Sequence, residues 1–151
     1  MQLFINIFIP LAVGGLSALI TKDSMQIFGS LNQPPLSPPG WLFPIVWTIL
    51  YVLMGIAAYL VTKSASQQAQ KKCALWVYSI QLIFNFFWTI IFFNMQQYLL
   101  AFFWLIALIL LIILTLKNFV KINKIAAYLL IPYLLWCCFA AYLNFGIVIL
   151  N

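Results

Sequence analysis

Histidine is absent from this chain of 151 residues, and Asp23 is its only acidic residue. Paired carboxylates for general acid–base catalysis, a histidine-based triad and metal sites built from histidine or carboxylates all require side chains that this sequence does not contain. We therefore expect no metal site and no conventional catalytic constellation. Charge of either sign is also scarce, at 5% of residues, whereas about a quarter of the residues in ordinary soluble domains are charged.

Hydrophobic residues make up 67% of the chain and are concentrated in five long runs. Each run has about 18 or more residues, which is enough for a helix to cross a hydrocarbon core of roughly 30 Å. The runs are apolar on all sides and too long for the strands of a membrane barrel. We predict an all-α integral membrane protein, a five-transmembrane-helix bundle that forms a single domain over residues 1–151. The predicted helices span about residues 3–21, 41–62, 73–93, 98–116 and 125–150.

Cysteine is rare as well, and its placement indicates no cofactor. Cys73, Cys137 and Cys138 all fall inside predicted helices, and their spacing is not that of a zinc or redox motif. We interpret them as small apolar residues of the core. The first apolar run has no basic segment before it and no small-residue cleavage site, so we expect a mature helix there and not a secretory signal.

The net charge of +6 arises from lysines that lie at the ends of the predicted helices. Lysines there contact water and anionic lipid headgroups, so we expect membrane lipids and not nucleic acid as their partners. Six lysines fall in the two connections that share one membrane face, against one, Lys22, on the other. By the positive-inside rule the N-terminus is cytoplasmic, and the first loop and the C-terminus lie on the opposite side. The six are Lys63, Lys71, Lys72, Lys117, Lys121 and Lys124.

The first loop, about residues 22–40, is the only long connection, and its second half reads "NQPPLSPPGW" over residues 32–41. Proline fixes φ and removes a backbone donor, and the residue before it is pushed out of the helical region. This proline-rich segment is therefore stiff and extended without helix or sheet. We predict that it forms a lid over a site within the bundle. The lid residues are Pro34, Pro38, Pro39, Gly40 and Trp41.

Polar and aromatic side chains recur at helical spacing in three of the predicted helices, which places each set on one face. Two interpretations stay open for each set: contact with other helices or with lipid, and the lining of a pocket. Uncharged amides are costly in hydrocarbon unless they are bonded, so the face with Gln81 and Asn85 must look inward. The sets are Phe43, Trp47 and Tyr51; Gln81, Asn85, Trp88 and Phe92; and Trp136, Ala140 and Leu143, with Asn144 at the margin.

Three aromatic faces with a few amides and no charge suit a large, flat, mostly apolar ligand that is held by stacking and a few hydrogen bonds. A free-base porphyrin, a sterol or a similar lipid fits this description. A metal in a bound tetrapyrrole would lack its commonest axial ligand, since the chain has no histidine.

Three segments resemble the signature segments of the TspO/MBR family, the tryptophan-rich sensory or translocator proteins. They are "PPLSPPGWLFPIVWTILYVLMG" at 34–55, "IQLIFNFFWTIIFF" at 80–93 and "LLIPYLLWCCFAAYLN" at 129–144. The resemblance spans the whole chain. It implies a five-helix bundle, often a homodimer, that binds porphyrins, benzodiazepine-type drugs and, in some members, cholesterol.

The resemblance also implies which residues bind the ligand, for which we expect protoporphyrin IX with no required cofactor. It implies a receptor or sensor that regulates tetrapyrrole or stress metabolism. Light-dependent degradation of protoporphyrin, through Trp47 and Trp136, is an alternative activity, and transport of porphyrin or lipid is another. The implied ligand-binding residues are Phe28, Phe43, Trp47, Tyr51, Asn85, Trp88, Trp136 and Ala140.

The sequence departs from the family pattern at three places. Trp104 stands where many relatives carry an acidic residue in the fourth helix, and Leu36 replaces a tryptophan that is usual in the proline loop. After Phe145 the chain reads "GIVILN", without the cation of the cholesterol-associated pattern. The missing acid predicts a change in pocket polarity. The missing cation argues against a sterol ligand and favours a bacterial cell membrane over an organelle.

Overall fold

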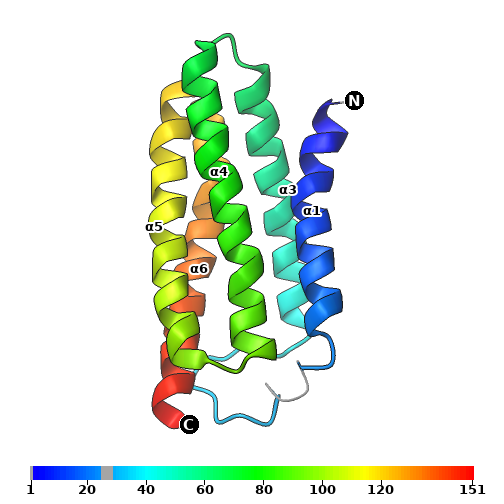
Figure 1. The fold of residues 1–151 in the computed structure, drawn as a ribbon, viewed down its shortest axis with the longest axis vertical. Coiled ribbons are helices and arrows are strands. Elements are labelled where there is room, and N and C mark those ends of the chain that lie inside the picture. Colours follow the sequence, from blue (N-terminus) through cyan, green and yellow to red (C-terminus); the bar gives the residue numbers. More distant parts are fainter. Residues whose placement is uncertain (1, 25–28) are drawn as a thin grey trace.

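The computed structural model describes residues 2–24 and 29–151 of the chain, and Figure 1 shows them as an antiparallel bundle of long helices. Each of the five long helices is long and apolar enough to cross a membrane, so the protein is an integral membrane protein of the predicted all-α class. A short π-helix, η1, extends α4 without a break. The helices are α1 (Gln2–Thr21), α3 (Leu42–Lys63), α4 (Gln68–Thr89), η1 (Ile90–Asn94), α5 (Tyr98–Ile122) and α6 (Lys124–Leu150).

Two helices extend further than the apolar runs from which they were predicted. The helix predicted to begin at Cys73 begins at Gln68, and the one predicted to end at Leu116 continues to Ile122. Lysine and glutamine are good helix formers, and the added turns contain these residues. Hydropathy marks the part of a helix that lies in hydrocarbon, whereas the backbone hydrogen bonds continue into the polar interface.

Neighbouring helices form a closed ring in which α3 packs between α1 and α6, α5 packs between α6 and α4, and α4 also contacts α1. The small residue Gly55 lets α1 and α3 approach closely. A Cβ atom at position 55 would collide with the backbone of Ile7. The lysine-bearing connections, α3–α4 and α5–α6, lie at the same end of the bundle as the N-terminus, and the C-terminus lies at the other end (Figure 1).

The prediction that all three cysteines belong to the core is wrong for two of them. Cys137 is fully buried, but Cys73 and Cys138 are exposed on the outside of the bundle. In a membrane bundle the outer surface faces lipid, which is as apolar as the core. A small apolar side chain can therefore lie on either side of a helix at little cost.

Candidate functional site

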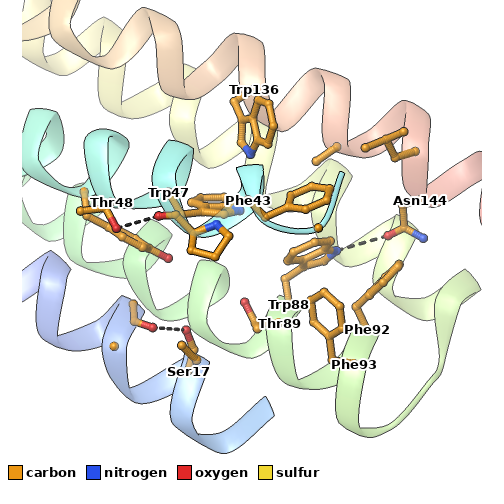
Figure 2. Close-up of a pocket in the computed structure, with 18 of the residues that line it drawn as sticks. Ser17, Phe43, Trp47, Thr48, Trp88, Thr89, Phe92, Phe93, Trp136 and Asn144 are labelled. Carbon is orange, nitrogen blue, oxygen red and sulfur yellow. Dashed lines mark hydrogen bonds between the residues drawn. The ribbon is translucent and has the colours of Figure 1, made fainter. Parts of the chain in front are cut away.

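A cavity of about 340 Å³ lies in the half of the bundle nearest the α1–α3 connection. It is formed where the C-terminal half of α1, the N-terminal half of α3, the end of α4 with η1, and the C-terminal half of α6 face one another. Figure 2 shows the aromatic side chains that converge on it from three of these elements. The lining residues are Leu11, Gly14, Gly15, Ser17, Ala18, Gly40, Phe43, Pro44, Trp47, Thr48, Tyr51, Trp88, Thr89, Phe92, Phe93, Trp136, Ala140, Leu143, Asn144 and Ile147.

Aromatic rings from α3 and α6 make one wall of the cavity. Trp47 stacks on Tyr51 one helical turn away, with ring centroids 5.6 Å apart and an interplanar angle of 29°. Phe43 meets Trp136 of α6 edge to face at 5.9 Å. The spacing of Phe43, Trp47 and Tyr51 thus produces a continuous aromatic surface, and these residues line the cavity with Trp136.

The opposite wall comes from α4 and η1 and is fixed to α6 by a hydrogen bond. Trp88 stacks on Phe92 at a centroid distance of 5.3 Å, and its Nε1 donates to Oδ1 of Asn144 at 3.2 Å (Figure 2). Asn144 in turn donates through Nδ2 to the carbonyl oxygen of Tyr98 at 2.9 Å. These two hydrogen bonds of Asn144 set the orientation of the Trp88 indole, and with it the width of the cavity between α4 and α6.

Most hydroxyl donors of the lining are already used within their own helices. Ser17 donates to the carbonyl oxygen of Gly14 at 2.9 Å, and Thr48 donates to that of Pro44 at 2.7 Å. In contrast, the indole Nε1 of Trp136 is buried and has no hydrogen-bond partner among the described residues. Figure 2 shows this nitrogen turned towards the side chains of α3. A buried donor without a partner is costly, and an acceptor on a bound ligand would satisfy it.

A chain of buried hydrogen bonds lies behind the α3 wall and links three helices. The hydroxyl of Tyr51 donates to Oδ1 of Asn85 at 2.9 Å, and Nδ2 of Asn85 donates to the hydroxyl oxygen of Tyr133 at 2.8 Å. The Tyr133 hydroxyl then donates to Oε1 of Gln81 at 2.6 Å. Finally, Nε2 of Gln81 lies 3.9 Å from the sulfur of Met54, which can only accept.

This chain resolves the two interpretations that were open for the amides of the third predicted helix. Gln81 and Asn85 face inward as expected, each 1% exposed, but they join α4 to α3 and α6. The expectation that Asn85 lines the pocket is not met, because Asn85 is not among the residues that line the cavity. Asn85 instead holds the hydroxyl of a residue that does line it.

The sequence-based predictions did not include Tyr133 or the residues of α1 that line the cavity. Tyr133 stands three residues before Trp136 and seven before Ala140, so the spacing that identified that face also predicts its hydroxyl to point inward. Gly14 and Ala18 of α1 line the cavity together with Ser17. Small side chains on one face leave room for a ligand as well as for another helix.

The predicted lid residues differ in where they lie. Gly40 lines the cavity, Pro34 packs against Gly146 of α6, and Trp41 is 68% exposed at the start of α3. Pro38 and Pro39 belong to the irregular segment before α3 but do not line the cavity. Phe28, predicted to bind the ligand from the lid side, lies outside the described residues.

Trp104, one of the departures from the family pattern, does not affect the lining of the cavity. Its ring stacks on Phe84 of α4 at a centroid distance of 4.4 Å, and its Nε1 donates to the carbonyl oxygen of Phe84 at 2.8 Å. The tryptophan therefore joins α5 to the outer side of α4. The predicted change in pocket polarity is not found, because this position is not among the lining residues.

Comparison with known proteins shows what the chain is similar to. The model of the TspO/MBR family matches residues 6–150. A tryptophan-rich protein TspO from Chlorobaculum tepidum is 39% identical over 142 residues, which cover 93% of this chain and 90% of the relative. Another from Archaeoglobus fulgidus is 36% identical over 152 residues, covering 100% and 97% of the two chains. The translocator protein of Ovis aries is 33% identical over 127 residues, covering 83% and 75%.

Proposed function

This chain belongs to the TspO/MBR family, and from that premise we propose that it is a membrane receptor or sensor whose cavity binds porphyrins and related flat, apolar molecules. Binding would regulate tetrapyrrole or stress metabolism. The proposal needs no cofactor and takes protoporphyrin IX as the ligand.

One observation carries the proposal: aromatic rings from α3, α4 and α6 face a common cavity, and Trp136 in its wall has a buried indole donor without a partner among the described residues. Flat conjugated molecules stack on such rings, and a volume of about 340 Å³ lies within the range of about 300–1,000 Å³ that is usual for ligand pockets. The carboxylates or other acceptors of a porphyrin would accept from Nε1 of Trp136. Within the described part of the chain, no charged side chain lines the cavity, which suits a mostly apolar ligand.

Titration of the purified protein with protoporphyrin IX tests this function. The shift of the Soret band and the quenching of tryptophan fluorescence report binding. Trp47→Phe and Trp136→Phe each remove stacking area, and the second also removes a donor, so we expect each to weaken binding about tenfold. Trp76→Phe is the matched control, because Trp76 is 66% exposed on α4 and does not line the cavity. Equal affinity of all three variants and the parent would refute the proposed site.

Light-dependent degradation of the porphyrin is a second candidate, favoured by the presence of both Trp47 and Trp136 in the cavity wall. Indoles beside a photosensitiser are readily oxidised. Illumination of the protein–porphyrin mixture, with the Soret band followed over time, separates degradation from binding. Turnover of many porphyrins per protein would support an enzyme. Loss that stops once the protein's own tryptophans are consumed would support binding alone.

We also propose a bacterial cell membrane as the location, with the lysine-rich end of the bundle in the cytoplasm. This orientation rests on the six lysines at the end that carries the N-terminus. Labelling of a Ser66→Cys variant and of a Ser24→Cys variant in intact cells with an impermeant thiol reagent tests it. Labelling of position 24 alone is expected, and labelling of position 66 alone would reverse the orientation. A homodimer stays a prediction from the family.

A further inference from the structure

The segment of residues 32–41, here called the strap, is attached at its beginning to α6 and at its end to α3. In Figure 1 the chain runs from the α1 side to the C-terminal end of α6 and then returns across the bundle to the start of α3. The strap therefore joins two of the helices that wall the cavity. Its residue Gly40 is itself part of the cavity lining.

Among the described residues, four hydrogen bonds hold the first half of the strap on the C-terminal end of α6 and on Asn151, which follows it. In one of them Nδ2 of Asn32 donates to the carbonyl oxygen of Leu150 at 3.4 Å. The hydroxyl of Tyr142 donates to the carbonyl oxygen of Pro35 at 2.7 Å. Asn151 and Asn32 bond reciprocally. Nδ2 of Asn151 donates to the carbonyl oxygen of Asn32 at 2.9 Å, and the backbone N–H of Asn32 donates to Oδ1 of Asn151 at 3.3 Å. Because prolines have no backbone N–H, the strap itself has few donors. The hydroxyl of Tyr142 on α6 supplies one for the carbonyl oxygen of Pro35.

Close packing supplements these bonds at Gly146, which lies between Tyr142 and Asn151 on α6. A Cβ atom at position 146 would lie 2.5 Å from Cγ and 2.6 Å from Cβ of Pro34. A real side chain atom cannot approach a proline ring so closely, and neither the ring nor the helix backbone can turn aside as a flexible side chain does. The glycine thus provides the surface on which the ring of Pro34 rests.

The same turns of α6 line the cavity on their other side. Ala140, Leu143, Asn144 and Ile147 recur at the spacing of a single helical face, and all four contact the cavity. Tyr142 and Gly146, which hold the strap, alternate with these lining residues along the helix. The position of the strap and the position of this cavity wall are therefore set by one rigid element.

The strap is also stiff between its two attachments. Ser37 donates through its hydroxyl to the carbonyl oxygen of Pro34 at 2.9 Å, which closes a turn around Leu36. Leu36 has a φ of 70°, a left-handed conformation that is uncommon for a residue with a side chain. With four prolines in ten residues, the strap has few alternative conformations. We expect it to leave the bundle as a unit when its α6 anchors are removed.

We propose that Tyr142, Gly146 and Asn151 are positioning residues that hold the strap across the end of the cavity and so control exchange between the cavity and water. None of them is part of the cavity lining. The effect on ligand exchange rests on the proposed porphyrin function. The effect on water access does not, which allows the two to be tested separately.

Access of a charged, membrane-impermeant thiol reagent to the cavity is the first measurement. The reporter is Leu143→Cys, placed in a chain in which the exposed Cys73 and Cys138 are replaced by alanine. Tyr142→Phe removes one hydrogen bond and keeps the ring, so we expect the reporter to react about threefold to tenfold faster. Gly146→Ala, which displaces Pro34, is expected to have at least as large an effect. Tyr128→Phe is the control, because Tyr128 is an exposed tyrosine near the other end of α6.

Dissociation of protoporphyrin IX from chains with native Leu143 is the second measurement, and the same variants are expected to accelerate it by a similar factor. Faster thiol labelling without any porphyrin binding would support the strap and refute the proposed ligand. Labelling rates equal to those of the Tyr128→Phe control in both Tyr142→Phe and Gly146→Ala would overturn the inference. Tyr142→Phe keeps the test decisive if Gly146→Ala does not fold.

Discussion

The hydrogen-bond chain behind the cavity leads to a quantitative prediction for the variant Asn85→Leu. Leucine is close to asparagine in size but cannot bond, so the substitution removes the bonds to Tyr51 and Tyr133 and leaves the Tyr51 hydroxyl buried without its acceptor. Each bond between transmembrane helices contributes about 0.6 kcal/mol on average and up to about 1.7 kcal/mol. For two bonds we expect the free energy of unfolding to fall by about 1–3 kcal/mol.

Reversible unfolding of the protein in mixed detergent micelles, followed by circular dichroism, measures this change. The control is Asn118→Leu, because Asn118 is only partly buried and its Nδ2 bonds to the carbonyl oxygen of Leu114 in its own helix, while its Oδ1 accepts a long thiol bond from Cys73 at 4.0 Å. We expect that control to change stability by less than about 0.5 kcal/mol.

A double-mutant cycle isolates the contribution of one bond in the chain. The variants are Asn85→Leu, Tyr133→Phe and their combination, and the expected coupling energy is about 0.6–1.7 kcal/mol. Strictly additive effects, or a stability of Asn85→Leu equal to that of the parent, would refute the assignment of Asn85 as a link between helices.

Two further substitutions test the packing and the connections of the bundle. Gly55→Ala places a Cβ against the backbone of Ile7 and should lower the free energy of unfolding by about 1–3 kcal/mol. Gly15→Ala, where an added Cβ meets no atom within 4 Å, should be neutral or stabilising. Equal melting temperatures of the two variants would contradict this. Lys71→Met removes the donor that bonds two carbonyl oxygens of the α3–α4 connection at 3.0 and 2.7 Å, so proteolysis there should be faster than in Lys72→Met. Identical cleavage rates would argue against this role of Lys71.

Hydropathy alone predicted the five helices because each apolar run forms a helix that is long and apolar enough to cross a membrane. The first turns of α4 were not predicted, since Gln68 and Lys71 are polar and a window that averages hydropathy excludes them. Helix propensity favours these turns, and Nζ of Lys71 also donates to the carbonyl oxygens of Thr62, at the end of α3, and of Ser64, just after it. Local composition carries no information about such a contact.

The candidate site was predictable where it depends on spacing within one helix, as for Trp47 with Tyr51 and for Trp136 with Ala140. Asn85 was harder to place, because the same inward face that can line a pocket can also bond a neighbouring helix. The deciding fact is that Asn85 bonds the hydroxyl of Tyr51 and that the cavity lining includes Tyr51 but not Asn85. This arrangement depends on how α3 and α4 pack against each other, which no single segment encodes.

The attachment of the strap has a consequence for the order in which the molecule is assembled. Asn32 bonds to Asn151, a residue 119 positions later in the chain, which directly follows α6 and is synthesised long after the strap. Chains are synthesised from the N-terminus at about 5–20 residues per second, so the strap has no partner for several seconds after its own synthesis. During that interval the four earlier helices can insert and pack, but the cavity lacks its α6 wall and its cover. The complete cavity therefore forms only after α6 has been synthesised, and a nascent chain without α6 lacks it.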